Sequence, residues 1–529
     1  MRSVKTSCHL PIRRGVGTER KLCNSRRLLR FQRSASIALA LGCCALSLDA
    51  ADDGQHLAGR SGKETKLLEQ FDKDHDGLLN PTERKLAREW LRQHRPQSTA
   101  SSAPERPRSG SKLSPADVKS FPASPLYDAQ VLRTFFLEFD NSDWAQELFD
   151  FHHTDVDVPA RLIVDGKTYR EVGVRLHGGS AGFKSAGGRK WSLHLSLDLV
   201  NDEQQVGGYR TINLLNSYDD PTFMRTVLYY QLAREFIPAP KANFARVVIN
   251  GESWGLYISA QPLNKDFTRD WFRASKGVRW KVSGRGAFRY LGPDAKDYKE
   301  VYELKSKDSE KAWADLIKLC RVLNETPAEQ LEKALQPLLD VDATLKFLAL
   351  ENALVNRDGQ WGRSTGYGIY QDEKGRFHFI PGSATESFRA AENFGRRGKI
   401  GGVQLDPFLG ADNSQKPLLS KLLSVPSLKT RYAGYIHSIA EEWLDWQKLG
   451  PMLQKYQALV SSEVNADTHK LYSTDAFIKG IGQDAADQSF SEWRRSINLK
   501  TFIEQRRQFL LNHPAIRKAE LQAQTSPNQ

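Results

Sequence analysis

Residues 349–388 constrain the fold more than any other segment of this 529-residue chain. They continue an apolar run at helical spacing that ends at the turn Asp358-Gly359. Two short strands, 368–371 and 377–380, are predicted after that turn and form a hairpin. The segment therefore predicts a helix, a loop that carries a carboxylate, and a hairpin in succession, which is the layout of kinase-type phosphoryl-transfer sites.

Asp358 is the candidate catalytic residue of this segment. As a general base or hydroxyl-orienting group it would accept a proton from an attacking substrate while metal ions and cations hold the phosphates. The alternative is an ordinary Asp-Gly turn after a helix. A second metal ligand is expected after the hairpin, yet that stretch reads Gly382-Ser383-Ala384-Thr385 and its first carboxylate is Glu386.

A glycine-rich loop, HGGSAGFKSAGG at 177–188, lies between strands predicted at 172–176 and 192–197. In kinases such a loop surrounds nucleotide phosphates with backbone N–H groups, and a lysine on the following strand neutralises them. Lys190 stands in the place for this role. The alternative is an ordinary surface cation beside Arg189.

Six motifs, in this order along the chain, resemble the spore coat protein H (CotH) kinase-like family. They are VGVRLHGGSAGF at 172–183, RKWSLHLSLD at 189–198, PTFMRTVLYYQL at 221–232, ARVVINGESWGLYI at 245–258, YELK at 302–305, and VNRDG at 355–359 with GRFHFIP at 375–381. The resemblance covers residues 125–514. It implies an α+β fold, with a kinase-like (CotH-type) domain that has a mixed or antiparallel sheet and a helical C-terminal part.

The resemblance also implies roles for single residues. Lys190 would grip the nucleotide phosphates with Arg175 and Ser180 close by, and Lys281 falls on a further family position. The implied cofactor is ATP with Mg²⁺ or Mn²⁺. Glu386 is the candidate substitute for a missing metal ligand.

Two departures from the family pattern bear on activity. Relatives resembling this sequence read Asp-Tyr-Asn-(Ile/Leu)-Tyr where this chain has Gly366-Tyr367-Gly368-Ile369-Tyr370, and Ile-Pro-(His/Trp)-Asp where it has Ile380-Pro381-Gly382-Ser383. The Asn and the Asp are the expected metal ligands, but Gly368 has no side chain and Ser383 is a neutral, weak ligand. We therefore expect a pseudokinase or binding scaffold. The alternative is an active ATP-dependent protein Ser/Thr kinase with Asp358 as its base.

The stretch FDKDHDGLLNPTE at 71–83 matches the register of an EF-hand calcium loop. Short carboxylates wrap a hard cation, a glycine at position 6 permits a sharp turn, position 7 offers a backbone carbonyl, and a glutamate at position 12 binds through both oxygens. The predicted Ca²⁺ ligands are Asp72, Asp74, Asp76, Leu78, Asn80 and Glu83. Helices are predicted on both sides, at 64–71 and 82–93. One alternative is a solvated acidic turn, and another makes bound calcium purely structural.

Residues 1–50 are predicted to be an export signal. A long basic region ends at Arg33, and an apolar run at 34–48 follows that is too short to span a bilayer comfortably. The pair Cys43-Cys44 supports a second interpretation, lipoprotein processing with a lipid on Cys43. The exported chain is then periplasmic, on the cell surface or secreted, and contacts a membrane only through the leader or that lipid. Cys320 remains as a packed thiol, which excludes an internal disulfide.

Composition divides the rest of the chain. An EF-hand unit at 58–95 is followed by 96–124, a stretch rich in Pro, Ser and Ala that predicts a disordered tether. The kinase-like domain at 125–514 and a tail at 515–529 come next. The formal charge of +13 is concentrated in the leader, so nucleic acid is not an expected partner. The expected partner or substrate is an unidentified extracytoplasmic protein.

Overall fold

The computed structural model describes residues 64–94, 109–178, 190–274, 276–282, 284–393, 399–482 and 497–525. The predicted leader with Cys43, the first part of the predicted tether, Ser180 and the last residues of the tail lie outside these ranges. Within the described ranges, no helix combines the length and the apolar character that are needed to cross a bilayer.

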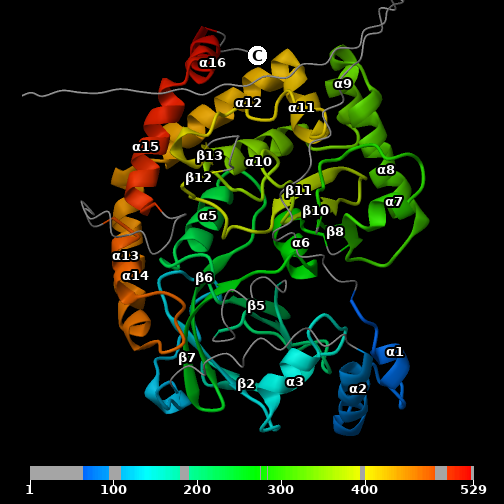
Figure 1. Cartoon of the computed structure of the whole chain (residues 1–529), viewed down its shortest axis with the longest axis vertical. Coiled ribbons are helices and arrows are strands. Elements are labelled where there is room, and N and C mark those ends of the chain that lie inside the picture. Colours follow the sequence, from blue (N-terminus) through cyan, green and yellow to red (C-terminus); the bar gives the residue numbers. More distant parts are fainter. Residues whose placement is uncertain are drawn as a thin grey trace, which may run out of the picture. The chain divides into compact units, whose positions relative to one another are not determined.

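Seven strands in the described part of the chain close into a barrel, in the order β1-β2-β3-β4-β5-β7-β6 (Figure 1). Parallel pairing of β1 with β6 completes the ring, and the other neighbours pair antiparallel. The strands are β1 (Arg133–Glu138), β2 (Val158–Val164), β3 (Lys167–Leu176), β4 (Leu193–Ser196), β5 (Thr211–Leu215), β6 (Ala242–Ile249) and β7 (Glu252–Ala260). The sheet is therefore mixed, which is one of the two arrangements that the resemblance implies, whereas its closure into a barrel is not predicted.

Strand β6 sends its side chains into two different cores. Ala245 and Val247 belong to the core inside the barrel, whereas Phe244 packs against the helical part outside it. This alternation is the two-residue period of a strand that is covered on both faces. The turn from β6 to β7 is Asn250-Gly251, with φ of 48° and 77°. These left-handed conformations are the ones that a tight two-residue hairpin requires.

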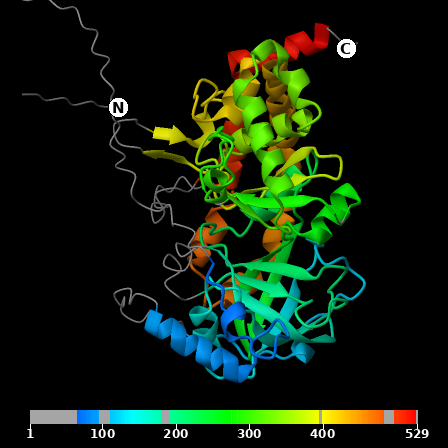
Figure 2. The same cartoon turned by 90° about the vertical axis from the view of Figure 1, so that its right-hand side faces the viewer.

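The helices on either side of the predicted calcium loop pack on the barrel. They are α1 (Leu68–Phe71) and α2 (Pro81–His94), and Figure 1 shows them beside α3 (Trp144–Asp150). Figure 2 shows α2, in blue, beside the barrel from the side. Four buried apolar residues of this segment share one core cluster with the barrel interior: Leu67 before α1, Leu79 in the loop, and Ala87 and Leu91 on α2. This packing holds the predicted EF-hand unit against the barrel.

Residues 109–124, the second half of the predicted tether, also contact the barrel. The backbone N–H of Gly110 donates to Glu252 at 2.8 Å, and the carbonyl of Phe121 accepts from the Arg133 guanidinium at 3.0 Å. Composition predicts disorder here because large apolar residues are few. The contacts instead come from backbone groups that the barrel satisfies, which composition does not reveal.

A second sheet, in the order β11-β10-β8-β9, lies among the helices. Its strands are β8 (Val278–Val282), β9 (Tyr302–Leu304), β10 (Tyr367–Gln371) and β11 (Phe377–Pro381), and β12 (Ala391–Asn393) pairs separately with β13 (Lys399–Gly401). The remaining helices are α5 (Arg225–Ala233), α6 (Lys265–Phe272), α7 (Lys296–Lys299), α8 (Glu310–Glu325), α9 (Ala328–Leu335), α10 (Val341–Ala353), α11 (Pro417–Ser424), α12 (Pro426–Ser438), α13 (Trp446–Ala466), α14 (Thr474–Lys479), α15 (Leu499–Asn512) and α16 (Pro514–Thr525). Shorter turns are η1 (Pro115–Asp117), η3 (Gly402–Gln404) and the π-helical η4 (Ile439–Trp443).

The segment at 349–388 has the predicted form, with α10 followed by the hairpin of β10 and β11. Helix α10 is buried over most of its length because it is apolar on nearly all faces. The predicted tail begins with α16, where Ile516 is fully buried in the helical core. The predicted packed thiol, Cys320, is buried on α8.

Candidate functional site

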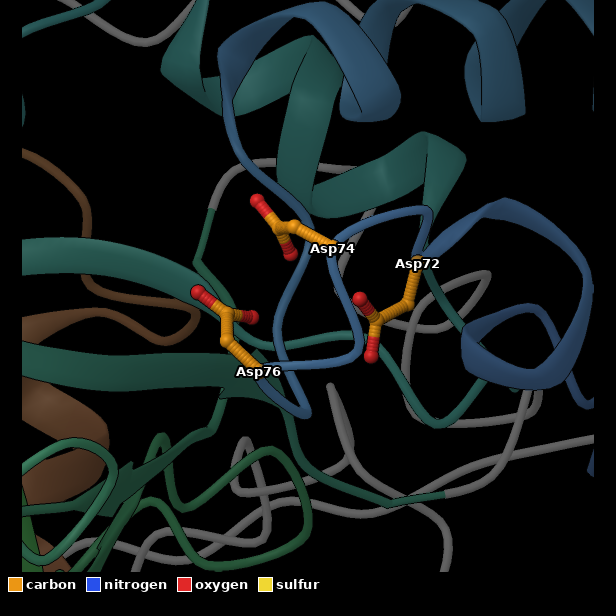
Figure 3. A group of neighbouring side chains, drawn as sticks. All are labelled: Asp72, Asp74 and Asp76. Atoms are coloured by element: carbon orange, nitrogen blue, oxygen red, sulfur yellow. The ribbon is translucent and has the colours of Figure 1, made fainter.

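Three aspartates of the loop between α1 and α2 converge. Oxygens of Asp72, Asp74 and Asp76 lie within 4.8 Å of one another, and Figure 3 shows their carboxylates around the space inside the loop. Gly77 has φ of +85°, which permits the turn that brings them together, and the N–H of Leu78 donates to Asp76 at 2.8 Å. Three carboxylates at this separation repel one another, so the loop favours a cation between them.

Asp72 has one oxygen that the protein leaves unsatisfied. Its Oδ2 accepts a hydrogen bond from the N–H of Gly77 at 2.9 Å, whereas its Oδ1 is buried and has no hydrogen-bond partner. Burial raises the pKa of Asp72, but the backbone N–H groups of Gly77 and His75 outweigh it and lower the pKa. An ionised oxygen that lacks a partner is suited to a hard, oxygen-seeking cation such as Ca²⁺.

Glu83, the predicted position-12 ligand, closes the loop and is only 4 % exposed. Its Oε1 accepts from the N–H of Lys73 at 2.7 Å, and its Oε2 accepts from the N–H of Asn80 at 3.0 Å. The Asn80 Oδ1 in return accepts the N–H of Glu83 at 3.1 Å, so the two residues also cap α2. A calcium ion would compete with these backbone groups for the oxygens of Glu83. The donor set consists of oxygens and fits Ca²⁺.

Asp358, the predicted base, lies in a buried loop after α10 and is ion-paired. Its Oδ1 accepts a hydrogen bond from Arg363 Nη1 at 2.9 Å, and the same nitrogen is 3.4 Å from Glu386 Oε1. Burial and the charge of Glu386 raise the pKa of Asp358, and Arg363 opposes this shift. The Arg363 guanidinium therefore bridges two carboxylates, as a divalent metal ion does in a phosphoryl-transfer site.

Further guanidinium groups balance the carboxylates around Asp358. Arg389 is 2 % exposed and lies 3.1 Å from Glu386 Oε2 and 3.3 Å from Asp219 Oδ2. Burial would raise the pKa of Glu386, but Arg389, Arg363 and Arg357 lower it below its usual range. We call the following eight residues the Asp358 cluster: Asp219, Asp220, Asp358 and Glu386, with Arg225, Arg357, Arg363 and Arg389. Its four acids face four arginines, so it has no excess of negative charge to attract a metal ion.

Side chains and backbone fill the space at the two substituted ligand positions. A Cβ at Gly368 would lie 2.1 Å from Cδ2 of Leu263, so an apolar side chain occupies the place where the family pattern has Asn. Gly366 has φ of +69°, and a Cβ there would lie 2.9 Å from Cβ of Ser383 and 3.3 Å from Oδ2 of Asp358. Ser383, the second position, thus lies beside the predicted base, and neither Gly368 nor Ser383 supplies a charged ligand.

Lys190, the predicted phosphate-gripping lysine, is fully buried and paired. Its Nζ lies 2.6 Å from Oδ2 of Asp467, and both side chains are 0 % exposed. Burial lowers the pKa of Lys190, and the charge and hydrogen bond of Asp467 oppose this shift. The ring of Tyr257 lies 4.7 Å from the ammonium. Within the described residues, the ion pairs of Lys190 and those of Asp358 have no residue in common, so the two predicted catalytic residues belong to separate groups.

The positive charges of Arg175 and Lys281, both at predicted cofactor-binding positions, act on His177. Burial lowers the pKa of His177 to about 3, and the charges of His194, Lys281 and Arg175 add to the shift. His177 follows β3 directly and begins the glycine-rich loop. Residues 179–189, which include Ser180 and most of this loop, lie outside the described residues.

The two histidines of this group are not predicted from the sequence. The rings of His177 and His194 are stacked with centroids 6.3 Å apart. The available signal is their position at the two ends of the glycine-rich loop, on neighbouring strands that pair antiparallel. Single histidines on strands are common, so this signal becomes specific only when the register of β3 and β4 is known.

Arg175 also contacts the predicted EF-hand unit. It lies 2.9 Å from Oδ1 of Asp157, next to β2, and 3.6 Å from Oε1 of Glu64, which precedes α1. The sequence places Glu64 and Arg175 in two different units. The structure joins them in one ion-paired group.

Comparison with known proteins identifies relatives of the larger part of the chain. The family model described as CotH kinase protein matches residues 174–510, a match that begins C-terminal to the predicted calcium loop. The inner spore coat protein H-like protein of Bacillus subtilis (strain 168) is 24 % identical over 320 residues, which are 60 % of this chain and 84 % of that protein. Inner spore coat protein H of the same organism is 26 % identical over 198 residues, which are 36 % of this chain and 53 % of that protein.

Proposed function

Because the chain belongs to the CotH kinase protein family, we propose that it is an exported, calcium-binding member that acts as a pseudokinase. It binds a phosphate group at Arg175 of the barrel strand β3 and Lys281 of β8 in the second sheet, and it serves as a scaffold for an extracytoplasmic partner, without phosphoryl transfer. The observation that carries this proposal is the position of Arg363 between Asp358 and Glu386.

Phosphoryl transfer of the kinase type depends on metal ions that neutralise the charge on the transferring group. A metal ion entering the Asp358 cluster would have to displace Arg363 from both carboxylates and would then face the positive charge of Arg389. It would also find no ligand at Gly368, where Leu263 fills the space. These features oppose metal binding where activity needs it.

The calcium part of the proposal rests on the loop between α1 and α2. Asp72, Asp74 and Asp76 would hold the ion from one side and Glu83 from the other, and the unpartnered Oδ1 of Asp72 would gain a partner. Bound calcium would supply positive charge and fix the angle between the two helices.

The export part rests on the predicted leader and on the names of the relatives. Both relatives are spore coat proteins by name, which is compatible with a location outside the cytoplasm. A basic region followed by a short apolar run supports the same interpretation.

An active kinase is the second candidate function, and one observation favours it. Glu386 shares Arg363 with Asp358, so the two carboxylates lie close together, and the Arg363 side chain is 41 % exposed. If Arg363 turned outward, Asp358 and Glu386 would form a pair of ligands for Mg²⁺ or Mn²⁺.

A thermal-shift titration with ATP and Mg²⁺ or Mn²⁺, combined with a phosphate-transfer assay on a general protein substrate, tests the proposal. A pseudokinase gives no transferred phosphate, and its response to nucleotide does not depend on Mg²⁺ or Mn²⁺. Transfer that is abolished by Asp358→Asn would replace the pseudokinase by the active kinase. Calcium is titrated separately, with Asp72→Ala as the variant that loses the response.

A further inference from the structure

The entering helix of the calcium loop is only half formed. The residue types from 64 to 71 favour helix, and a calcium loop of this kind stands between two helices. In the structure α1 spans only Leu68–Phe71. Thr65 instead forms a parallel bridge with Thr154, in which its N–H donates to the carbonyl of His153 at 2.9 Å. The first half of the expected helix is therefore attached to the barrel domain.

Asp155 fixes the point at which the helix begins. Its Oδ1 accepts the N–H of Leu67 at 2.8 Å and that of Leu68 at 3.4 Å, as an N-cap side chain does. The N–H of Asp155 in turn donates to the carbonyl of Thr65 at 3.3 Å. Over residues 64–67 the local sequence favours a helix, whereas the contacts with the barrel hold the chain in a bridge. Such a conflict is expected in a segment that has two competing conformations.

The attached segment delivers Glu64 to Arg175. Glu64 Oε1 lies 3.6 Å from Arg175 Nη1, and Asp157 holds the same guanidinium through Nε at 2.9 Å. Two carboxylates therefore pair with the arginine that the proposed function assigns to phosphate, and the other oxygen of Glu64 accepts a hydrogen bond from Lys66 Nζ at 2.7 Å. Removing one of the two carboxylates would leave a guanidinium that is 33 % exposed, with spare donors.

Ion pairs hold helix α2 in place. A conformational change in the loop between α1 and α2 therefore has to move α1. Arg84 Nε donates to Glu147 at 2.8 Å, and Arg88 donates to Asp150 and to Asp143, each at 2.7 Å. These acids lie on or next to α3, which packs on the barrel. The segment just before α1 is attached through the Thr65 bridge, the Asp155 cap, the buried Leu67 and the pair of Glu64 with Arg175.

We propose that calcium binding extends α1 back to Glu64, withdraws Glu64 from Arg175 and so frees Arg175 to bind a phosphate group. Calcium changes the geometry of the helix pair in sensor loops of this kind, and with α2 clamped the change falls on α1. Glu64 is then an internal competitor of phosphate, and calcium and phosphate favour the same state. This inference rests on the proposed function of Arg175.

The test measures the affinity of the purified protein for AMP, with and without calcium. AMP carries one phosphate group and chelates calcium only weakly. Calcium is expected to tighten AMP binding by about fivefold or more, and AMP is expected to tighten calcium binding by the same factor, because coupling between two sites is reciprocal. Glu64→Gln is expected to bind AMP tightly without calcium and to show no further gain with it. Glu69→Gln removes the same charge from the exposed side of α1 and is expected to keep the coupling.

Amide hydrogen exchange gives a second readout that does not depend on AMP. Calcium is expected to speed exchange in the peptide covering 151–157, because Asp155 loses its bond to Thr65. Calcium binding that leaves both this exchange and the AMP affinity unchanged overturns the coupling and leaves the pseudokinase standing. A protein that binds no calcium overturns the coupling together with the calcium part of the proposed function. Phosphate transfer to a substrate would overturn the pseudokinase but not the coupling.

Discussion

Lys190 and Asp467 form a fully buried ion pair between residues 277 positions apart in the sequence. Asp467 follows the last residue of α13, and its Oδ2 also accepts the N–H of Leu256 on β7 at 3.1 Å. The pair therefore joins the segment before β4, which follows the glycine-rich loop, to the end of α13. Through Leu256, the same carboxylate also contacts β7. In the structure Lys190 thus stabilises the fold, whereas its sequence context predicts a contact with nucleotide.

Lys190→Ala is expected to lower the free energy of unfolding by about 3–5 kcal/mol, because it leaves the Asp467 charge buried and unpaired. Urea denaturation followed by tryptophan fluorescence measures the loss. The double variant Lys190→Ala/Asp467→Ala is the control and is expected to recover part of it. A Lys190→Ala protein that unfolds like the unmodified chain would contradict the structural role and favour the nucleotide role.

Restoring the family ligands is expected to create metal binding. The combined change Gly368→Asn, Ser383→Asp, Leu263→Ala and Arg363→Ala supplies two ligands, clears the space at Gly368 and removes the competing guanidinium. Mn²⁺ is expected to raise the melting temperature of this variant and to leave that of the unmodified chain unchanged.

The matched control for this variant keeps Ser383 and Arg363 and carries only Gly368→Asn with Leu263→Ala. It is expected to show no response to Mn²⁺, because the guanidinium still bridges Asp358 and Glu386. An equal response of both variants would mean that Arg363 does not block the site.

The sequence predicts some parts of the fold and of the Asp358 cluster but not others. α10 and the hairpin after it are predictable because their periodicity is strong and local. Closure of the barrel is not, since it depends on β1 pairing with β6 more than a hundred residues later in the chain. The missing ligands at Gly368 and Ser383 are visible in the sequence. Leu263 fills the space beside Gly368, and Arg363 takes the place of a metal ion between Asp358 and Glu386. Neither can be predicted, because both depend on side-chain packing that no local pattern encodes.

For the predicted EF-hand, the sequence indicates the loop but not the domain boundary. The loop matches the calcium-binding pattern because its ligand types stand at the required spacing. The Pro- and Ser-rich stretch after it suggests an independent unit, but apolar residues of α2 join the barrel core. The packing of α2 on the barrel also depends on ion pairs such as that of Arg84 with Glu147. These two residues are 63 positions apart, and no sequence pattern indicates that they meet.

The unfolding free energy is expected to fall as pH rises from 7 to 8, and Glu351 is the main cause. Burial raises the pKa of Glu351 from its ordinary value to about 8, and its Oε2 has no hydrogen-bond partner. Below pH about 8 the folded chain keeps a proton there that the unfolded chain has released, so stability falls with pH at up to about 1.4 kcal/mol per pH unit. Urea denaturation at several pH values measures the slope.

Glu351→Gln is the control for this pH dependence, since it keeps the shape and removes the titration. Its slope between pH 7 and 8 is expected to be flatter than that of the unmodified chain. His177 and His194 do not titrate in this window, because burial lowers their pKa values to about 3 and about 4. Equal slopes in the two proteins would mean that Glu351 is ionised in the folded state.

Leu91→Ala in α2 is expected to destabilise the barrel domain by about 2–5 kcal/mol, because Leu91 is 3 % exposed within the barrel core cluster. Leu86→Ala on the same helix is the matched control. Its side chain is 53 % exposed, so an effect within about 0.5 kcal/mol is expected. A Leu91→Ala variant with normal urea unfolding would indicate an EF-hand that moves independently of the barrel.

Asp72→Asn is expected to change the melting temperature in opposite directions without and with calcium. Without calcium the variant relieves the repulsion among Asp72, Asp74 and Asp76, so it melts at a slightly higher temperature than the unmodified chain. With calcium the unmodified chain gains stability at each higher concentration, and the variant gains less because it has lost a charged ligand. Asp140→Asn, an exposed change outside the loop, is expected to leave both melting temperatures unchanged. If calcium raised the melting temperatures of the Asp72 variant and the unmodified chain by the same amount at every concentration, the converging carboxylates would be a solvated acidic turn.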